Sequence, residues 1–364
     1  MYKIEYHKSE TGVKVQVCTY APDGGVAEIH AILQVEERVD EPFVEQYKRI
    51  CKEVDNFVHF LNGATVVMKR YFVSDAANQA PQMDCKDDNT SIIQQPPLNG
   101  SKIALWIYMQ KGKSNYTTQW TMNMMEPEGD SYHQTRTLLE RYEAMLQKDG
   151  MTLADNCIRT WFFVRDVDTQ YKGLVVARRE NFEGQQLTNH THYLASTGIQ
   201  GLPSNPKAII QLGAVAIKDI QPGQQTYLYA PTHLNPTYEY GVTFERGVKV
   251  TFGDRSHLYI SGTASINNKG EVVHVGDIRK QTQRMWENVE ALLAEGEATF
   301  DDVTQIAVYL RDIADYKVVD KMFAEKFPDT PYVITYAPVC RPTWLIEMEC
   351  MAITDKGNKS FKAY

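Results

Sequence analysis

Residues 276–312 contain a helix pattern, GDIRKQTQRMWENVEALLAEG (276–296), followed by a strand pattern, VTQIAVYLRD (303–312). The helix pattern has Gln281 near its start and ends at Gly296, a residue type that favours helix C-termini. The strand pattern is apolar and ends at Asp312. Helix, glycine stop, strand and terminal aspartate form a unit that can be sought in the rest of the chain.

The same order of features occurs twice earlier in the chain. The two helix patterns are EPFVEQYKRICKEVDNFVHFLN (41–62) and DSYHQTRTLLERYEAMLQKDG (130–150). The strand patterns that follow them are residues 64–75 and 156–166. The glutamines near the helix starts and the aspartates at the strand ends are Gln46, Gln134, Asp75 and Asp166. Three occurrences in one order predict an internal repeat.

Each repeat is also expected to end in an apolar strand, at residues 102–109, 208–217 and 345–353. A second helix pattern precedes the last two of these strands, at 169–182 and 314–327. The first repeat has a polar, proline-containing segment at 76–101 instead, which we predict to be a long loop. The fold class is therefore predicted to be α+β, with helices on one face of each sheet and a degenerate first repeat.

These patterns predict four regions. They are a degenerate repeat at 1–110, a second repeat at 111–218, a Tyr/Pro-rich connector at 219–240 and a C-terminal repeat at 241–364.

Composition narrows the classes of partner. The net charge is −8 and no Lys/Arg run occurs, so no nucleic-acid partner is expected. No apolar run is long enough to span a membrane, and the six cysteines lack C-x-x-C spacing. We predict a cytoplasmic protein without a metal or cofactor, either a monomer or a weak homo-oligomer.

The closing segment CRPTWLIEMECMAI (340–353) carries two acids, Glu347 and Glu349, on one face of its predicted strand. A carboxylate is costly to bury without a partner or a purpose, although an edge strand with a solvated face would explain both acids. Aligning the closing strands on Ile217 and Ile353 places Gln211 opposite Glu347 and Gly213 opposite Glu349. Glu347 is thus our candidate functional acid, and Glu349 is interpreted as an exposed strand residue.

The third repeat resembles the RidA family, also called YjgF or endoribonuclease L-PSP. The segments that carry the resemblance are HLYISGTASINNKGEVVHVGD (257–277), the Gln281 to Asn288 helix, VYLRD (308–312) and PYVITYAPVCRPTWLIEMECMAI (331–353). The resemblance implies chorismate-mutase-like α+β units that form a trimer with pockets between neighbours. Three copies in one chain then imply a single-chain pseudo-trimer.

Family deaminases carry an arginine in a Pro-x-Arg-Ser/Thr motif that holds the substrate carboxylate. Here the motif reads Pro331-Tyr332-Val333-Ile334, and valine cannot make that charged contact. Enamine or imine deamination in its usual form is therefore disfavoured, unless Arg341 replaces the missing arginine.

A second resemblance is to the chorismatases. Its motifs are Arg159-Thr160-Trp161, Ser196-Thr197-Gly198-Ile199, Gly262-Thr263-Ala264-Ser265 and Cys340 with Glu347. The resemblance implies hydrolysis of chorismate to pyruvate, or its conversion to hydroxybenzoate, with Glu347 as the acid. A cysteine seven positions before this glutamate is similar to the hydroxybenzoate-forming type, which implies a role for Cys340.

An acid for this chemistry must remain protonated near neutral pH, so the pKa of Glu347 has to be raised by apolar surroundings. Chorismate also has two carboxylates that need cationic or neutral donors. The candidates are Arg341, Arg159, Arg246, Tyr238 and Tyr240. Gly262 is expected to allow a close backbone approach, and Cys340 is interpreted either as a small pocket residue or as a guide for an intermediate.

The predicted function is therefore a chorismatase-like enzyme that acts on a small carboxylate and releases pyruvate. One alternative is a non-catalytic or regulatory RidA-fold protein that binds a small acid. Another is a variant imine or enamine deaminase that lacks the usual arginine. Ribonuclease activity is disfavoured by the net charge of −8.

Overall fold

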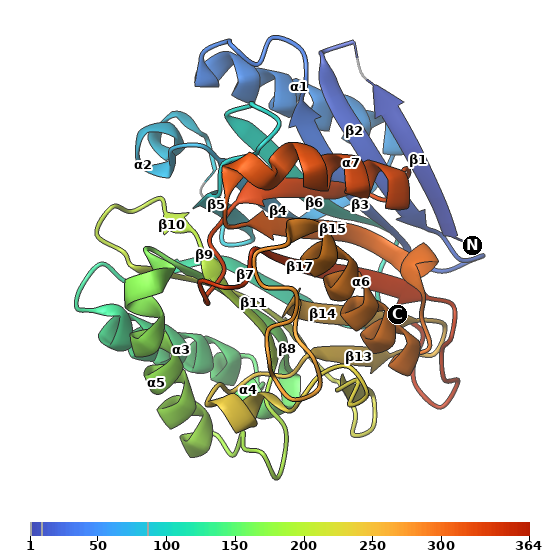
Figure 1. Ribbon diagram of the computed structural model, residues 1–364. Helices are drawn as coiled ribbons and strands as arrows, with labels where there is room; N and C mark the ends of the chain where they lie inside the picture. Colours follow the sequence, from blue (N-terminus) through green and yellow to red (C-terminus); the bar gives the residue numbers. More distant parts are fainter. Residues whose placement is uncertain (1, 9, 86) are drawn as a thin grey trace.

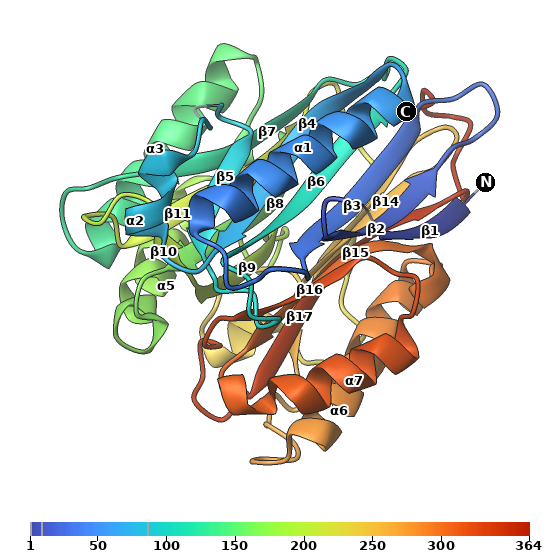
Figure 2. The same ribbon diagram turned by 90° about the horizontal axis from the view of Figure 1, so that it is seen from above.

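The computed structural model describes residues 2–8, 10–85 and 87–364, with side chains described for 10–85, 87–239 and 241–364. The chain forms three β-sheets, and helices lie on three different sides of them (Figures 1 and 2). Among these residues, no helix combines the length and apolar character needed to cross a membrane.

The first sheet has seven strands. Their order is β1 (Tyr2–Lys8), β2 (Val13–Tyr20), β3 (Ala27–Val35), β6 (Ile103–Lys111), β4 (Ala64–Val73), β5 (Thr90–Gln94) and β10 (Leu202–Pro203). Helix α1 (Phe43–Leu61) buries one face against this sheet. The predicted loop at 76–101 instead contains the short helices α2 (Ala76–Gln79) and η1 (Ala80–Gln82) and strand β5, which pairs with β4.

The second sheet has four strands, in the order β7 (Thr118–Met125), β11 (Ile210–Ile217), β8 (Cys157–Val164) and β9 (Ala195–Gln200). Its helices are α3 (Ser131–Lys148), α4 (Leu153–Asn156) and α5 (Val167–Gly184). Helix α3 begins where predicted, because the Asp130 side chain accepts a hydrogen bond from His133 N and caps the first turn.

The third sheet has six strands. Their order is β12 (Gln225–Leu228), β13 (Gly247–Thr251), β14 (Ser256–Ala264), β17 (Ile346–Thr354), β15 (Val303–Leu310) and β16 (Tyr332–Tyr336). The helices of this repeat are α6 (Ile278–Glu295) and α7 (Tyr316–Lys326), with short helices η2 (Thr237–Tyr240), η3 (Phe300–Asp302) and η4 (Ile313–Asp315). The predicted connector at 219–240 supplies β12, so it extends the third sheet as well as joining two repeats.

The three repeats share one topology. In each, the closing strand lies between two antiparallel neighbours, and the strand beyond them is added in parallel, as in β4–β5, β8–β9 and β15–β16. Each also has a register shift at the same place in the strand after its first helix, between Val66 and Met68, Cys157 and Arg159, and Val303 and Gln305. The predicted α+β pseudo-trimer is confirmed.

The repeated glutamine ties each helix to the strand that closes its repeat. Gln281 accepts a hydrogen bond from Leu345 N at 3.0 Å and donates to Thr343 O at 3.0 Å. In the same way, the Gln46 side chain accepts a hydrogen bond from Lys102 N at 2.8 Å, and the Gln134 side chain accepts one from Ile209 N at 2.7 Å. Each donor lies one residue before a closing strand. The buried glutamines thus satisfy half-buried backbone groups, which explains why they recur.

The faces of the sheets opposite the helices contribute to a shared interior. Trp106 of the first repeat, Val215 of the second and Met348 of the third, one from each closing strand, belong to one buried apolar cluster. The three closing strands therefore approach one another inside the molecule, and pockets between repeats can be lined by residues far apart in sequence.

Candidate functional site

Strand β17 carries Glu347 and Glu349 into the interior. It is hydrogen-bonded to β14 on one side and β15 on the other, and all nine of its residues are buried. Glu347 is 4% exposed and Glu349 is 2% exposed. The interpretation of this stretch as an edge strand with a solvated face is wrong, because both edges of β17 are paired.

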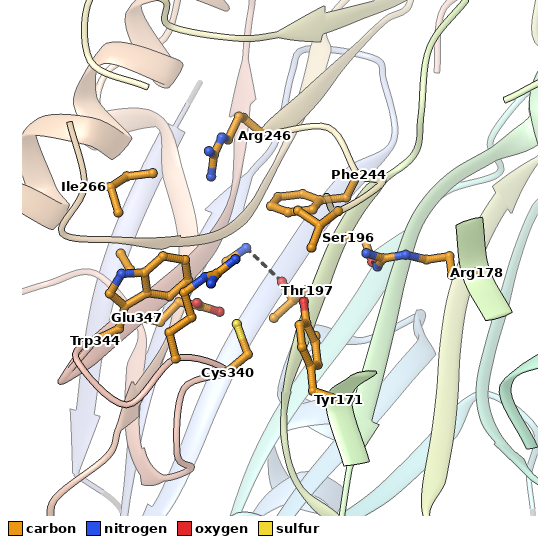
Figure 3. Close-up of a pocket in the computed structure, with 15 residues that line it drawn as sticks. Tyr171, Arg178, Ser196, Thr197, Phe244, Arg246, Ile266, Cys340, Trp344 and Glu347 are labelled. Atoms are coloured by element: carbon orange, nitrogen blue, oxygen red, sulfur yellow. Dashed lines mark hydrogen bonds between the residues drawn. The ribbon is translucent and has the colours of Figure 1, made fainter. Parts of the chain in front are cut away.

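A pocket of about 500 Å³, counting the part open to solvent, lies between the second and third repeats (Figure 3). Its lining residues are Tyr171, Arg178, Ser196, Thr197, Gly198, Val242, Phe244, Arg246, Gly262, Ala264, Ile266, Cys340, Arg341, Trp344 and Glu347. Strand β9 and helix α5 supply the wall from the second repeat, whereas β14, β17 and the turn before β17 supply the wall from the third.

Glu347 is the carboxyl group of this pocket. Burial and, to a lesser extent, the negative charge of the neighbouring Glu349 together raise its pKa to about 8, against the opposite effects of Arg159 and Arg246. Glu347 is therefore mainly protonated at pH 7 and can donate a proton to a bound molecule.

Gly262 gives the Glu347 carboxyl its space. The pairing of β14 with β17 shifts register between Ile260 and Thr263, so that Ser261 and Gly262 form a bulge at the pocket. A Cβ atom on Gly262 would lie against Glu347 Oε1 and 2.8 Å from Glu347 Cδ. The expected close approach at Gly262 is thus to the side chain of Glu347.

We expect Gly262→Ala to reduce turnover about 100-fold, because the added methyl group displaces the Glu347 carboxyl from its position in the pocket. Steady-state kinetics of the purified variant measure the change. Gly184→Ala, in open space at the end of helix α5 and without a positive φ, is the matched control and should retain activity. Equal kcat values for Gly262→Ala and the wild-type protein would contradict this role.

Three arginines surround the pocket. Arg178 is 1% exposed and donates to Ser196 Oγ at 3.4 Å and Thr243 Oγ1 at 3.3 Å. Arg246 is 3% exposed and donates to Asn235 O at 3.1 Å. Arg341 is exposed, and its guanidinium carbon lies over the Trp344 ring, 5.5 Å from the ring centroid. The pocket therefore has the charge to bind an anion with more than one carboxylate.

Sequence reasoning missed Arg178, although a signal for it exists. Leu174, Arg178 and Phe182 follow at spacings of one helical turn, and all three are buried on the same face of α5. An arginine within an apolar stripe indicates a buried charge that needs a partner or a ligand.

Cys340 points into the pocket beside Glu347 and Tyr171 (Figure 3). Burial and, to a lesser extent, the neighbouring Glu347 together raise the pKa of its thiol to about 12, against the effects of Tyr171 and Arg341. The thiol is therefore protonated at neutral pH. A thiol rather than a thiolate is a poor nucleophile, so this arrangement favours the interpretation that Cys340 shapes the pocket.

Five of the eight predicted site residues line the same pocket. They are Glu347, Cys340, Arg341, Arg246 and Gly262. Arg159 lies behind the pocket wall, where its guanidinium donates to Ser261 Oγ at 3.0 Å and Glu349 Oε2 at 2.8 Å. Tyr238 lines a neighbouring pocket and is 47% exposed. The side chain of Tyr240 lies outside the described residues.

The other two repeats have no acid at the position of Glu347. Strand register makes Ala104, Gln211 and Glu347 equivalent, because they pair with Phe72, Phe163 and Tyr309, respectively. Gln211 donates to Ser91 Oγ at 2.9 Å and Met122 O at 3.2 Å, so it contributes to a packed interface. The acid is specific to the third repeat.

The position at which family deaminases carry their arginine is also changed in all three repeats. Val333 pairs with Ala307, and its equivalents by register are Ser91 and Thr197. Thr197 is the one that faces Glu347 across the pocket. A substrate carboxylate in this pocket would therefore have to be bound by arginines at other positions of the chain.

The C-terminal part of the chain is similar in sequence to known proteins. Residues 244–354 match the family model of Endoribonuclease L-PSP. Over 98 residues the chain is 34% identical to the 3-aminoacrylate deaminase RutC of Acinetobacter baylyi, covering 26% of this chain and 77% of that protein. A RutC family protein of Pyrococcus abyssi is 35% identical over 98 residues, with 26% and 76% covered.

A solved structure of a chorismatase is similar over most of the chain. It has 19% sequence identity and a TM-score of 0.64, and the match covers 79% of this chain and 93% of that one. This likeness concerns the fold. Together with the sequence matches, it shows that the chain belongs to the RidA (YjgF, endoribonuclease L-PSP) superfamily and resembles a chorismatase in its architecture.

Proposed function

We propose that the protein is an enzyme that cleaves the enolpyruvyl ether of chorismate, or of a similar small dicarboxylate, and releases pyruvate. Glu347 is the general acid. The observation that carries the proposal is a buried carboxyl, with its pKa raised to about 8, in a pocket surrounded by three arginines. The likeness to a chorismatase fold supports this choice of substrate.

The arginines bind the two substrate carboxylates. Arg178 reaches the pocket from the second repeat, and Arg246 and Arg341 reach it from the third. Two buried guanidiniums bind anions more strongly than exposed ones, because less water competes for them. This anchoring presents the uncharged enol ether to Glu347.

The reaction then begins with proton transfer from Glu347 to the terminal methylene carbon of the enol ether. The C=C electron pair forms the new C–H bond, and the adjacent carbon becomes an oxocarbenium ion. Water adds to that carbon and returns a proton to the Glu347 carboxylate. The resulting hemiketal breaks its bond to the ring oxygen, which leaves pyruvate and a ring alcohol. Trapping by a ring hydroxyl instead of water would change the product, and Cys340 lies where it can favour one trap over the other.

Arg178→Gln is expected to raise KM about 10- to 100-fold with a smaller effect on kcat, because a charged hydrogen bond to a substrate carboxylate is lost. Arg179→Gln is the matched control, since Arg179 is the exposed neighbour on the same helix. Thermal unfolding of both variants checks that Arg178 is not required for folding. An unchanged KM in a folded Arg178→Gln variant would remove Arg178 from substrate binding.

The proposal is tested by incubating the purified protein with chorismate and measuring pyruvate with a lactate dehydrogenase coupled assay. Pyruvate should appear in proportion to enzyme concentration. Chorismate that raises the thermal stability of the protein without any turnover would favour the non-catalytic alternative.

A second candidate is deamination of a small enamine or imine acid, favoured by the 34% identity to a 3-aminoacrylate deaminase. Because Val333, Thr197 and Ser91 occupy the positions of the family arginine, Arg178 or Arg341 would have to hold the carboxylate. Ammonia release from enzymatically generated 2-aminoacrylate distinguishes this activity, since pyruvate is a product of both reactions.

A further inference from the structure

Glu349 receives four hydrogen bonds in the interior of the molecule. Its Oε1 accepts from Arg70 Nη1 at 3.0 Å and Trp161 Nε1 at 2.9 Å. Its Oε2 accepts from Arg159 Nη2 at 2.8 Å and Thr197 Oγ1 at 2.5 Å. Arg70 belongs to the first repeat, the other three donors belong to the second, and Glu349 belongs to the third. The interpretation of Glu349 as an exposed strand residue is wrong.

The register of the strands shows that this cluster lies where the three repeats meet. Glu349 pairs with Ala307, and the equivalents of Ala307 are Arg70 and Trp161, the two donors to Oε1. Arg70 is fully buried and its guanidinium lies over the Trp161 ring at 4.7 Å. Burying an ion pair costs several kcal/mol in desolvation, and apolar side chains would fill the same space at lower cost. A charged centre is therefore unnecessary for packing alone.

The cluster is connected to the acid of the pocket. Thr197 Oγ1, which donates to Glu349, accepts a hydrogen bond from Gly262 N at 2.9 Å. Gly262 is the residue on which the Glu347 carboxyl rests. Glu347 and Glu349 are also two positions apart on β17 and share one face.

We propose that Glu349 is a positioning residue for Glu347, and that the first repeat takes part in the site through Arg70, which holds the Glu349 carboxylate in place. This inference deepens the proposed function and rests on it for its catalytic consequence. The pocket between the second and third repeats then depends on a side chain from each of the three.

Glu349 acts on Glu347 through geometry and through charge. Its bond to Thr197 fixes the Gly262 backbone, and hence the surface against which the Glu347 carboxyl lies. Burial acts against ionisation of Glu349, but Arg159, Arg70 and Thr197 lower its pKa, so it remains an anion. An anion this close disfavours a second negative charge on Glu347. The other titratable or charged groups around Glu347 are Arg159, Arg178, Arg246, Arg341, Cys340, Tyr171 and Tyr309.

The test is a carbon-13 NMR titration of the Glu347 side chain in protein labelled at its glutamate carboxyls. The Glu347 signal is the one that disappears in Glu347→Gln. Glu349→Gln should lower the pKa of Glu347 by about one unit, a tenfold loss of proton affinity, because the neighbouring negative charge is removed. The alkaline limb of the pH profile for pyruvate release should move down by the same amount.

Two further variants make the outcome decisive. Arg70→Gln removes a cation from beside Glu349, so it should raise the pKa of Glu347, in the opposite direction. Glu28→Gln disrupts another buried ion pair, with Arg255 at 2.7 Å between the first and third repeats, and should leave the Glu347 titration unchanged. Arg70→Gln also gives an answer if Glu349→Gln does not fold.

An unchanged Glu347 titration in a folded Glu349→Gln or Arg70→Gln variant would overturn the inference. So would shifts in the same direction in both variants. The titration requires no turnover, so it separates this inference from the proposed function. Shifted titrations without pyruvate from chorismate would support the coupling of Glu349 to Glu347 and refute the proposed reaction.

Discussion

Glu347→Gln is expected to lower kcat for pyruvate release from chorismate by about 10²- to 10⁴-fold, the usual contribution of a positioned general acid. Glutamine keeps the size and polarity of the side chain but has no proton of suitable acidity. Wild-type turnover should also decline as the pH rises through about 8, the value to which the pKa of Glu347 is raised. Steady-state kinetics between pH 6 and 9 measure both effects.

The matched control is Glu290→Gln, which makes the same change at an exposed position of α6. It should retain wild-type kcat and the wild-type pH profile. A Glu347→Gln variant with more than a tenth of the wild-type kcat would show that another group supplies the proton.

The same substitution is expected to stabilise the protein at alkaline pH. In the folded state Glu347 keeps its proton up to about pH 8, whereas in the unfolded chain it ionises near its ordinary value of 4.5. Between these two values the folded state binds more protons, so the free energy of unfolding falls as the pH rises. Glutamine does not titrate. The stability advantage of Glu347→Gln should therefore grow by about 3 kcal/mol between pH 5 and pH 8.

Urea unfolding of both proteins at pH 5 and pH 8 tests this expectation, again with Glu290→Gln as the control. The comparison depends on the difference between the two pH values, so packing changes that do not vary with pH cancel. Parallel stability curves for Glu347→Gln and the wild-type protein would show that Glu347 is ionised in the folded state at pH 7. Such a result would also remove it as a general acid.

The repeat was predictable from sequence because its signature has local causes. Gln281 and its equivalents bond the backbone just before each closing strand, and Asp75 and Asp312 cap the turns that follow their strands. These roles restrict the residue type at fixed positions, so they leave a pattern that spacing can detect. Aligning the closing strands also showed from the sequence that the second repeat has Gln211, and no acid, opposite Glu347.

The centre of the molecule was not predictable in this way. Glu349 looked like a residue of a solvated strand because its partners, Arg70 and Arg159, are 279 and 190 positions away in the chain. Arg159 was expected in the pocket but binds Glu349 behind its wall. Tyr238 was expected as a donor, but the chain between β12 and β13 places it in a neighbouring pocket. Contacts across repeat interfaces leave no periodic signal in the sequence.

The distribution of charge explains how one site can arise in a body of three repeats. The three closing strands carry Ala104, Gln211 and Glu347 at one equivalent position. Two residues further along, they carry Trp106, Gly213 and Glu349. Both acids belong to the third repeat, and the cations that pair with Glu349 come from the first and second. The buried charges lower stability, and their retention is expected where function requires them.

The most direct test of general acid catalysis is the reaction of the wild-type protein with chorismate in D₂O, followed by mass spectrometry of the pyruvate. The Glu347 carboxyl exchanges its proton with solvent, so the methyl group of each pyruvate should carry one deuterium. Pyruvate incubated with the protein in D₂O corrects for exchange after release. Absence of pyruvate, or pyruvate formed without solvent deuterium, would contradict proton transfer from Glu347 to the enol ether.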